Sequence, residues 1–197
     1  MQAKRLRGAM FPAFISRHIL HRVKTGRTMK KQSGILILCL DKSGSMSGQP
    51  FKALQSGVSS FAQKIYEEGM FEEFITLFYD HAIKEIKENT FDQYKSRVEK
   101  MRADGGTNFI PVFKRIYEVL KKHADKEVSV VFFTDGQAGD DKRRLDLEFN
   151  VMKKEASLVK SRFLTIGLSA SHDAKFLNQI ALAGSDMGNF FYIDFAQ

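Results

Sequence analysis

The chain has 197 residues, 43% of them hydrophobic and 27% charged, which is the composition of an ordinary globular domain and excludes a wholly disordered or repetitive chain. Its net charge is +8, but residues 1–33 hold nine of the 31 basic residues and no acid, so residues 34–197 carry 22 basic and 23 acidic residues, a net of −1. The body is therefore disfavoured as a nucleic-acid binder, and the basic front end requires its own interpretation.

The first segment, residues 1–33, is a basic N-terminal extension to the body at residues 34–197. From Phe11, next to Pro12, apolar residues recur at every fourth position, which predicts an amphipathic helix with a stripe of Phe11, Ile15, Ile19 and Val23. We expect this helix to dock on a face of the body. Three other interpretations stay open: a mitochondrial targeting peptide, a basic arm that contacts a membrane or RNA, or the end of an upstream region.

Short apolar runs then alternate with helical patterns along the body. The runs are rich in Val, Ile, Leu and Phe on both faces, which is typical of buried parallel strands, and they occupy residues 34–40, 74–79, 128–133, 163–168 and 190–195. Apolar residues at steps of three and four predict helices that begin near Phe51, Phe91, Phe109, Leu145 and Phe176. The alternation predicts a doubly wound, Rossmann-like α/β sheet of five parallel strands with helices on both faces.

One further strand breaks this alternation. Residues 82–87 follow the run at 74–79 after a gap too short for a crossover, so we expect a hairpin and an antiparallel edge strand. The charges of Lys84, Glu85 and Lys87 suit an edge that must not pair with other chains.

No apolar run approaches the roughly 20 residues that a transmembrane helix needs. The single cysteine, Cys39, excludes an internal disulfide framework and lies within the first apolar run, so we interpret it as a core residue. Together with the lack of a secretory signal pattern, this favours an intracellular, cytoplasmic setting, with mitochondrial targeting as the alternative above.

Polar residues gather where the predicted strands end. Asp41-Lys42-Ser43-Gly44-Ser45 follows the first strand, Thr134-Asp135-Gly136 follows the strand at 128–133, and Gly105-Gly106-Thr107 precedes a helix. Ligands of open α/β sheets bind at the carboxyl ends of the strands. Carboxylates and hydroxyls are hard oxygen ligands that suit Mg²⁺, and glycine at positions 44, 105, 106 and 136 allows a tight backbone around an ion.

These three elements, in this order and each at a strand end, resemble the von Willebrand factor A domain with its metal-ion-dependent adhesion site. The resemblance covers residues 34–195. It implies a metal site with five ligands, directly or through water: Asp41, Ser43, Ser45, Thr107 and Asp135. The implied ion is Mg²⁺, with Mn²⁺ or Ca²⁺ as alternatives.

The sequence departs from the family pattern at its end. Domains of this family usually close with a helix after the last strand, whereas this sequence stops at Gln197 directly after the run at 190–195. We expect the predicted N-terminal helix to cover the sheet face that the closing helix would occupy.

The functional expectation is a Mg²⁺-dependent protein-binding module whose metal captures an Asp or Glu carboxylate of a partner protein. The expected rim around the metal consists of Lys42, Met46, Gln49, Asn108 and Gln137. The alternative is a scaffold domain of a larger intracellular assembly, without a metal or with a structural ion. Catalysis is disfavoured, because the chain has no phosphate-binding loop, dinucleotide-binding turn or nucleophile elbow.

Overall fold

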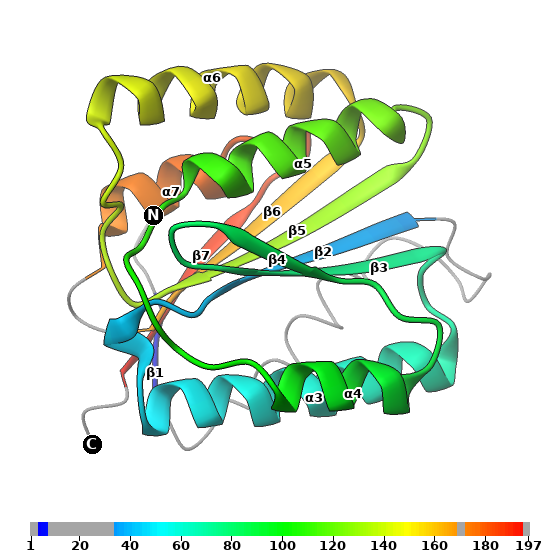
Figure 1. The fold of residues 1–197 in the computed structure, drawn as a ribbon. Helices are drawn as coiled ribbons and strands as arrows, with labels where there is room; N and C mark the ends of the chain where they lie inside the picture. Colours follow the sequence, from blue (N-terminus) through cyan, green and yellow to red (C-terminus); the bar gives the residue numbers. More distant parts are fainter. Residues whose placement is uncertain (1–3, 8–33, 169–171, 195–197) are drawn as a thin grey trace.

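A computed structural model describes residues 4–7, 34–168 and 172–194 of the chain. These residues form a seven-stranded sheet in the order β1-β7-β6-β5-β2-β3-β4, flanked by helices on both faces (Figure 1). The strands are β1 Lys4–Arg7, β2 Gly34–Asp41, β3 Glu73–Tyr79, β4 Ile83–Ile86, β5 Glu127–Thr134, β6 Ser161–Gly167 and β7 Asn189–Asp194. The helices are the short 3-10 turn η3 Gly44–Met46, then α3 Gln49–Glu68, α4 Phe91–Glu99, α5 Ile110–Lys122, α6 Lys142–Leu158 and α7 Ala174–Ala181.

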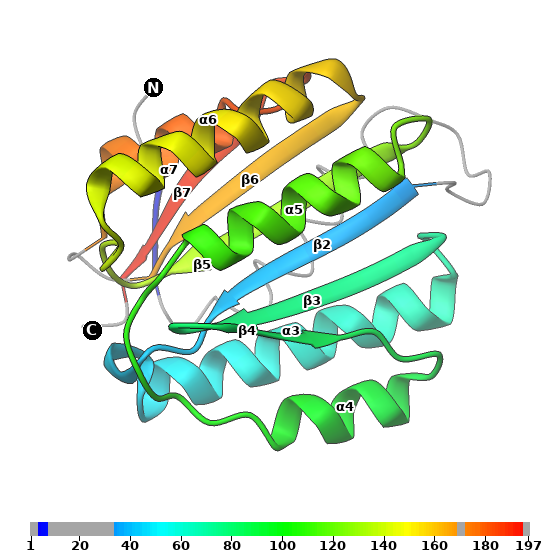
Figure 2. The ribbon, with the colours of Figure 1, turned by 45° about the horizontal axis from the view of Figure 1, so that its top comes forward.

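The predicted doubly wound sheet is confirmed. Strands β2, β3, β5, β6 and β7 are parallel, and β4 pairs antiparallel with β3 at one edge, as the short gap after residue 79 predicted. Helices α5, α6 and α7 cover one face, and α3 and α4 lie on the other (Figures 1 and 2).

The sequence did not predict β1. This strand pairs parallel with β7, with Lys4 opposite Phe191, and adds a sixth parallel strand at the edge opposite β4. Its four residues, KRLR, have no strand-like run of apolar side chains, so the pairing depends on the free edge of β7 and not on local propensity. The predicted helix with the stripe at residues 11–23 lies outside the described residues.

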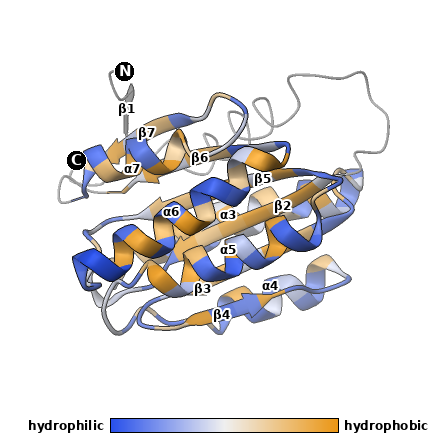
Figure 3. Cartoon of the chain, turned by 90° about the horizontal axis from the view of Figure 1, so that it is seen from above, coloured by the Kyte–Doolittle hydropathy of each residue, from blue (hydrophilic) through white to orange (hydrophobic). Residues whose placement is uncertain are grey.

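The sheet separates two apolar cores, because successive side chains of each buried strand point to opposite faces. On β2, Leu36, Leu38 and Leu40 pack with the apolar face of α3, and the alternate residues face the layer of α5 and α6. Cys39 is one of these alternate residues: it is fully buried, and burial raises its thiol pKa, as fits a core side chain. Figure 3 shows the strands as mainly hydrophobic and the outer faces of the helices as hydrophilic.

No helix in the described part of the chain is both long enough and apolar enough to cross a membrane.

Candidate metal site at the carboxyl ends of β2 and β5

The sheet topology brings the two aspartates of the candidate site to the same edge. Strands β2 and β5 are neighbours, with Leu40 opposite Phe133, so Asp41 and Thr134 leave the sheet side by side. Because the strands are parallel, their carboxyl ends and the loops that follow share one edge. The distant sequence segments at 41 and 134 thus form one site.

Asp41 is a buried carboxylate held by two donors. Its Oδ1 accepts a hydrogen bond from the backbone N–H of Ser43 at 2.8 Å, and its Oδ2 accepts one from the hydroxyl of Thr134 at 2.6 Å. Burial raises the pKa of Asp41 above its ordinary value, the hydrogen bonds from Ser43 and Thr134 oppose that rise, and the nearby charge of Asp135 adds to it. A cation would offset the cost of burying this charge.

The two serines connect Asp41 to Asp135. The hydroxyl oxygens of Ser43 and Ser45 lie 3.0 Å apart, and the Ser45 hydroxyl donates to Oδ1 of Asp135 at 2.9 Å. Burial also raises the pKa of Asp135, and the hydrogen bond from Ser45 opposes the rise. Spacing by two residues therefore places both hydroxyls between the two carboxylates.

The loop before α5 brings Thr107 to the same place. Gly105 accepts a hydrogen bond from the backbone N–H of Gly44 at 2.9 Å, and Thr107 accepts one from Gly139 at 2.6 Å. A Cβ atom built on Gly136 would lie 3.7 Å from the Thr107 hydroxyl oxygen, which places this hydroxyl directly beside the loop of Asp135. The structure thus brings together all five residues that the sequence suggested as ligands.

Gly105 and Gly106 differ in what they contribute. Gly105 has a φ of +74°, and a Cβ there would lie 2.8 Å from Nδ1 of His81 and 3.4 Å from Cβ of Asp80. A Cβ on Gly106 would meet nothing within 4 Å. Only the first of the two glycines is required by this backbone.

The five expected rim residues differ in where the structure places them. Gln49 and Gln137 are exposed and Asn108 is half-buried, all on segments adjoining the site. The expectation for Met46 is wrong: its side chain is fully buried in the core with Leu40 and α3, because the η3 turn directs this apolar residue inward. Lys42 is not a free rim cation either, since its ammonium group pairs with Asp80 and its side chain is 14% exposed.

Asp80 supports the loops of the site, although no motif in the sequence indicated this role. Its carboxylate binds the Lys42 ammonium and accepts from the Ala82 N–H at 2.9 Å, while its backbone carbonyl accepts from the Asn108 N–H at 2.8 Å. Burial opposes the charged form, but the hydrogen bonds and charge of Lys42, Ala82 and His81 outweigh it and lower the Asp80 pKa. The sequence did contain one indication of this role, because Asp80 directly follows the strand β3 and so lies at the same edge of the sheet as the site.

Two more side chains fix the loops. Thr134, quoted with the motif but not assigned a role, donates to Asp41. Asp140 accepts a hydrogen bond from the backbone N–H of Phe109 at 2.6 Å, and so fastens the start of α5 to the loop after β5. Thr134 thus helps to hold Asp41 in place, and Asp140 helps to hold the loop that carries Thr107.

The donor set fits a hard cation. Two carboxylates and three hydroxyls are oxygen donors of the kind that Mg²⁺ accepts alongside water. Among the described residues, no group of three or more His, Cys, Asp or Glu side chains gathers in the manner of a carboxylate-rich or thiolate site. Asp41, Ser43, Ser45, Thr107 and Asp135 are the residues that would hold the ion.

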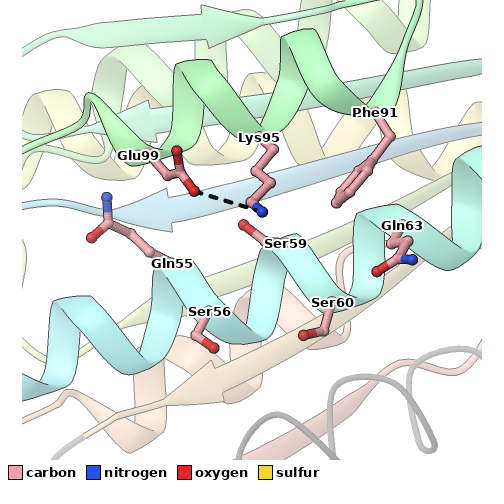
Figure 4. A pocket seen from close by; sticks show the side chains of 8 residues that line it. All are labelled: Gln55, Ser56, Ser59, Ser60, Gln63, Phe91, Lys95 and Glu99. Carbon is pink, nitrogen blue, oxygen red and sulfur yellow. Dashed lines mark ion pairs between the residues drawn. The ribbon is translucent and has the colours of Figure 1, made fainter.

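A groove between α3 and α4 is separate from this edge (Figure 4). It is lined mainly by polar side chains along α3 and α4, among them Ser56, Ser59, Gln63 and the Lys95–Glu99 ion pair. These helices flank the sheet face, whereas the candidate metal site lies at the ends of the strands.

Residues 36–197 match the sequence pattern of the von Willebrand factor type A domain, so the chain belongs to this family. Solved structures share the fold: the von Willebrand factor type A protein from Catenulispora acidiphila aligns with a TM-score of 0.66 at 15% identity, over 82% of this chain and 39% of that one. The SpRpn10 VWA domain aligns with a TM-score of 0.60 at 14% identity, over 84% of this chain and 90% of that one. Domains of this family are generally interaction modules.

Two further relatives bear on the site and on chain length. Proximal thread matrix protein 1 from the mussel byssus, in a structure with a zinc-occupied MIDAS motif, has a TM-score of 0.63 at 15% identity, over 83% of this chain and 42% of that one. The protein sll0103 of Synechocystis is 29% identical over 168 residues, which are 81% of this chain and 37% of that protein. The chain thus spans little more than a third of that relative.

Proposed function

We propose that the chain is a metal-dependent protein-binding module that holds Mg²⁺ at the carboxyl ends of β2 and β5 and captures an Asp or Glu side chain of a partner protein. The observation that carries the proposal is the cluster of Asp41, Ser43, Ser45, Thr107 and Asp135, which three separate loops bring to one edge of the sheet. The zinc-occupied MIDAS motif of the mussel protein supports a metal at this place in the fold.

The charge balance of the site favours a carboxylate as the outside ligand. Two carboxylates match the charge of a divalent cation and the three hydroxyls add none, so no excess negative charge around the bound ion would repel a further anionic oxygen ligand. Ser45 is exposed and Thr107 is half-buried, so the ion would face solvent on this side. Gln49, Asn108 and Gln137 surround the site and would select the partner, while the metal supplies the anchor.

The first experiment tests the metal by calorimetric titration of the full chain with MgCl₂, MnCl₂ and ZnCl₂. We expect one site per chain in the wild type and none in Asp41→Ala or Thr107→Ala. The matched control is Asp104→Asn, which removes an exposed carboxylate from the same loop without touching the cluster. Equal binding by Asp41→Ala and wild type would contradict the metal site.

The second experiment tests the ligand class. A random peptide display library is selected on the full chain with Mg²⁺, and the recovered peptides are measured again in excess chelator and as Asp→Asn or Glu→Gln versions. We expect peptides that require both the metal and one acidic side chain. Peptides that bind equally in chelator would refute carboxylate capture through the metal.

The scaffold function is the second candidate. The side chains of the described site also hold one another in place, since the Ser43 and Ser45 hydroxyls lie 3.0 Å apart, Ser45 donates to Asp135, and Thr134 donates to Asp41. No metal binding in the first experiment, with the variants folded, would favour this candidate. Metal binding without any acid-dependent peptide in the second would favour a structural ion.

A further inference from the structure

One half of the α3-side face of the sheet carries a continuous apolar patch. Val131 on β5 lies opposite Leu164 on β6, and Phe133, Ile166 and Phe191 lie opposite one another across β5, β6 and β7. Together with Ile193, these side chains are between 0% and 8% exposed. The patch is therefore covered.

The patch is continuous with the apolar core of α3, but the described helices lie mainly over other parts of the sheet. Helices α5, α6 and α7 lie on the opposite face, and α3 and α4 lie beside the β2–β3–β4 half of the sheet (Figures 1 and 2). The α5-side face of β5 and β6, with Val130, Phe132 and Phe163, belongs to the other core with α5 and α6. The β6–β7 end of the α3-side face needs a further segment.

The sheet topology identifies where such a segment runs. Strand β1 ends at Arg7 and β2 begins at Gly34, and both are parallel members of the same sheet. A parallel connection joins the carboxyl end of the first strand to the amino end of the second, and β7, β6 and β5 lie between β1 and β2 in the sheet. These are the three strands that carry the patch.

The handedness of crossovers selects the face. The β2–α3–β3 connection advances toward the β4 edge with its helix on the α3 side, and the β5–α6–β6 and β6–α7–β7 connections advance toward the β1 edge with their helices on the other side. The β1-to-β2 connection advances toward the β4 edge, as β2–α3–β3 does. A right-handed crossover, the form that parallel connections almost always take, therefore passes over the α3-side face.

We propose that residues 8–33 form this crossover and cover the patch with the stripe of Phe11, Ile15, Ile19 and Val23. The length suffices: β1 and β2 are four strand spacings apart, or about 19 Å, and a helix over residues 11–23 would itself span about 20 Å. The stripe gives the predicted helix one apolar face that can pack on the sheet. Arg17 and Lys24 fall on the opposite side of the same helix, toward solvent. The basic segment is then an integral layer of the domain.

The test compares two double variants of the full chain. Ile15→Asp/Ile19→Asp places charges in the stripe, and Arg17→Asp/Lys24→Asp makes a larger change of charge on the opposite side of the same predicted helix. We expect the stripe variant to melt about 10 °C or more below the wild type and the control variant to melt within about 3 °C of it. Equal, small shifts in both variants would overturn the proposal.

A labelling experiment locates the effect. In a Cys39→Ala background, a cysteine replaces Ile166 in the patch or Val130 on the α5-side face, and its reaction with a maleimide is followed below the melting transition. We expect the stripe variant to speed labelling at position 166 by about tenfold or more and to leave position 130 protected. Equal acceleration at both positions would indicate general loosening and contradict a specific cover.

The same experiment separates the other occupants. If a second copy of the chain covers the patch, dilution of the wild type will speed labelling at position 166, and sedimentation will show a dimer. If another protein covers it, position 166 will react rapidly in the purified wild-type chain. Either result refutes coverage by residues 8–33.

Discussion

At the residue scale, the candidate site depends on side chains that hold others in place. Thr134 donates to Asp41, and Asp80 joins Lys42 to the loop that carries Asn108. The sequence motif names the oxygen-bearing residues but not these supports, because a support is defined by a contact between segments far apart in sequence. Asp80 and Lys42 are separated by 38 residues.

The Lys42–Asp80 pair gives a prediction at this scale. The pKa of Asp80 lies below its ordinary value of 3.8 in the folded chain, so the pair adds stability above about pH 4 that is lost as the pH falls through the lower, folded pKa. We expect Lys42→Met to lower the free energy of unfolding by about 1–3 kcal/mol at pH 7. The deficit should shrink as the pH falls below about 4, as measured by urea denaturation across this range.

The matched control for this pair is Lys95→Met, which breaks an exposed ion pair with Glu99 at 4.0 Å on α4. Exposed pairs of this kind add little, so stability should hardly change at any pH. A Lys42→Met deficit that stays constant from pH 7 to pH 3 would show that the pair does not act through the charge of Asp80.

At the scale of elements, hydrogen bonds between loops determine where the five candidate ligands come together. The loop before α5 is fixed from three sides: to Gly44 through Gly105, to Asp80 through Asn108, and to Asp140 through Phe109. These bonds carry Thr107 to the ends of β2 and β5. Thr107 alone gave no sign in the sequence of which strand it would approach.

The neighbouring glycines of this loop provide a matched test. Gly105→Ala forces a Cβ into a φ of +74° beside His81 and Asp80, so we expect a loss of about 1–2 kcal/mol in stability and weaker metal binding. Gly106→Ala adds a Cβ in open space, so we expect less than about 0.5 kcal/mol and unchanged metal binding. Urea denaturation and calorimetric titration measure both, and indistinguishable variants would contradict this description of the loop.

At the scale of the whole molecule, the candidate metal site joins three loops, so an ion bound there would link ion binding to folding. An ion that binds only the folded chain stabilises it by about 2.7 kcal/mol at a concentration 100 times its dissociation constant. For a chain of this size, that corresponds to a rise in melting temperature of about 5–10 °C. We expect this rise on addition of MgCl₂, measured by differential scanning calorimetry.

The variant Asp135→Asn should abolish the rise. Without Mg²⁺, the same variant should be at least as stable as the wild type, because it removes a buried negative charge that lies close to Asp41. An equal rise in wild type and Asp135→Asn would place the stabilising ion elsewhere on the chain.

The sequence by itself determined the features that short-range patterns encode. The parallel strands, the helices and the edge hairpin follow from apolar periodicity, because each element buries a face that its own residues define. The positions of Asp41 and Asp135, directly after two parallel strands, predict that both lie at the same edge of the sheet. The full set of five candidate ligands came from the resemblance to the von Willebrand factor A domain.

The tertiary structure decided what depends on neighbours distant in sequence. It turned Met46 into the core and paired Lys42 with Asp80, which removed both from the rim. It also placed residues 4–7 beside β7, a pairing that arises from an open strand edge and not from the side chains KRLR. The net charge of +8 shows the same difference between sequence and structure. The sequence shows that the excess of basic residues lies in residues 1–33, and only the structure shows that the start of this segment, β1, is part of the sheet.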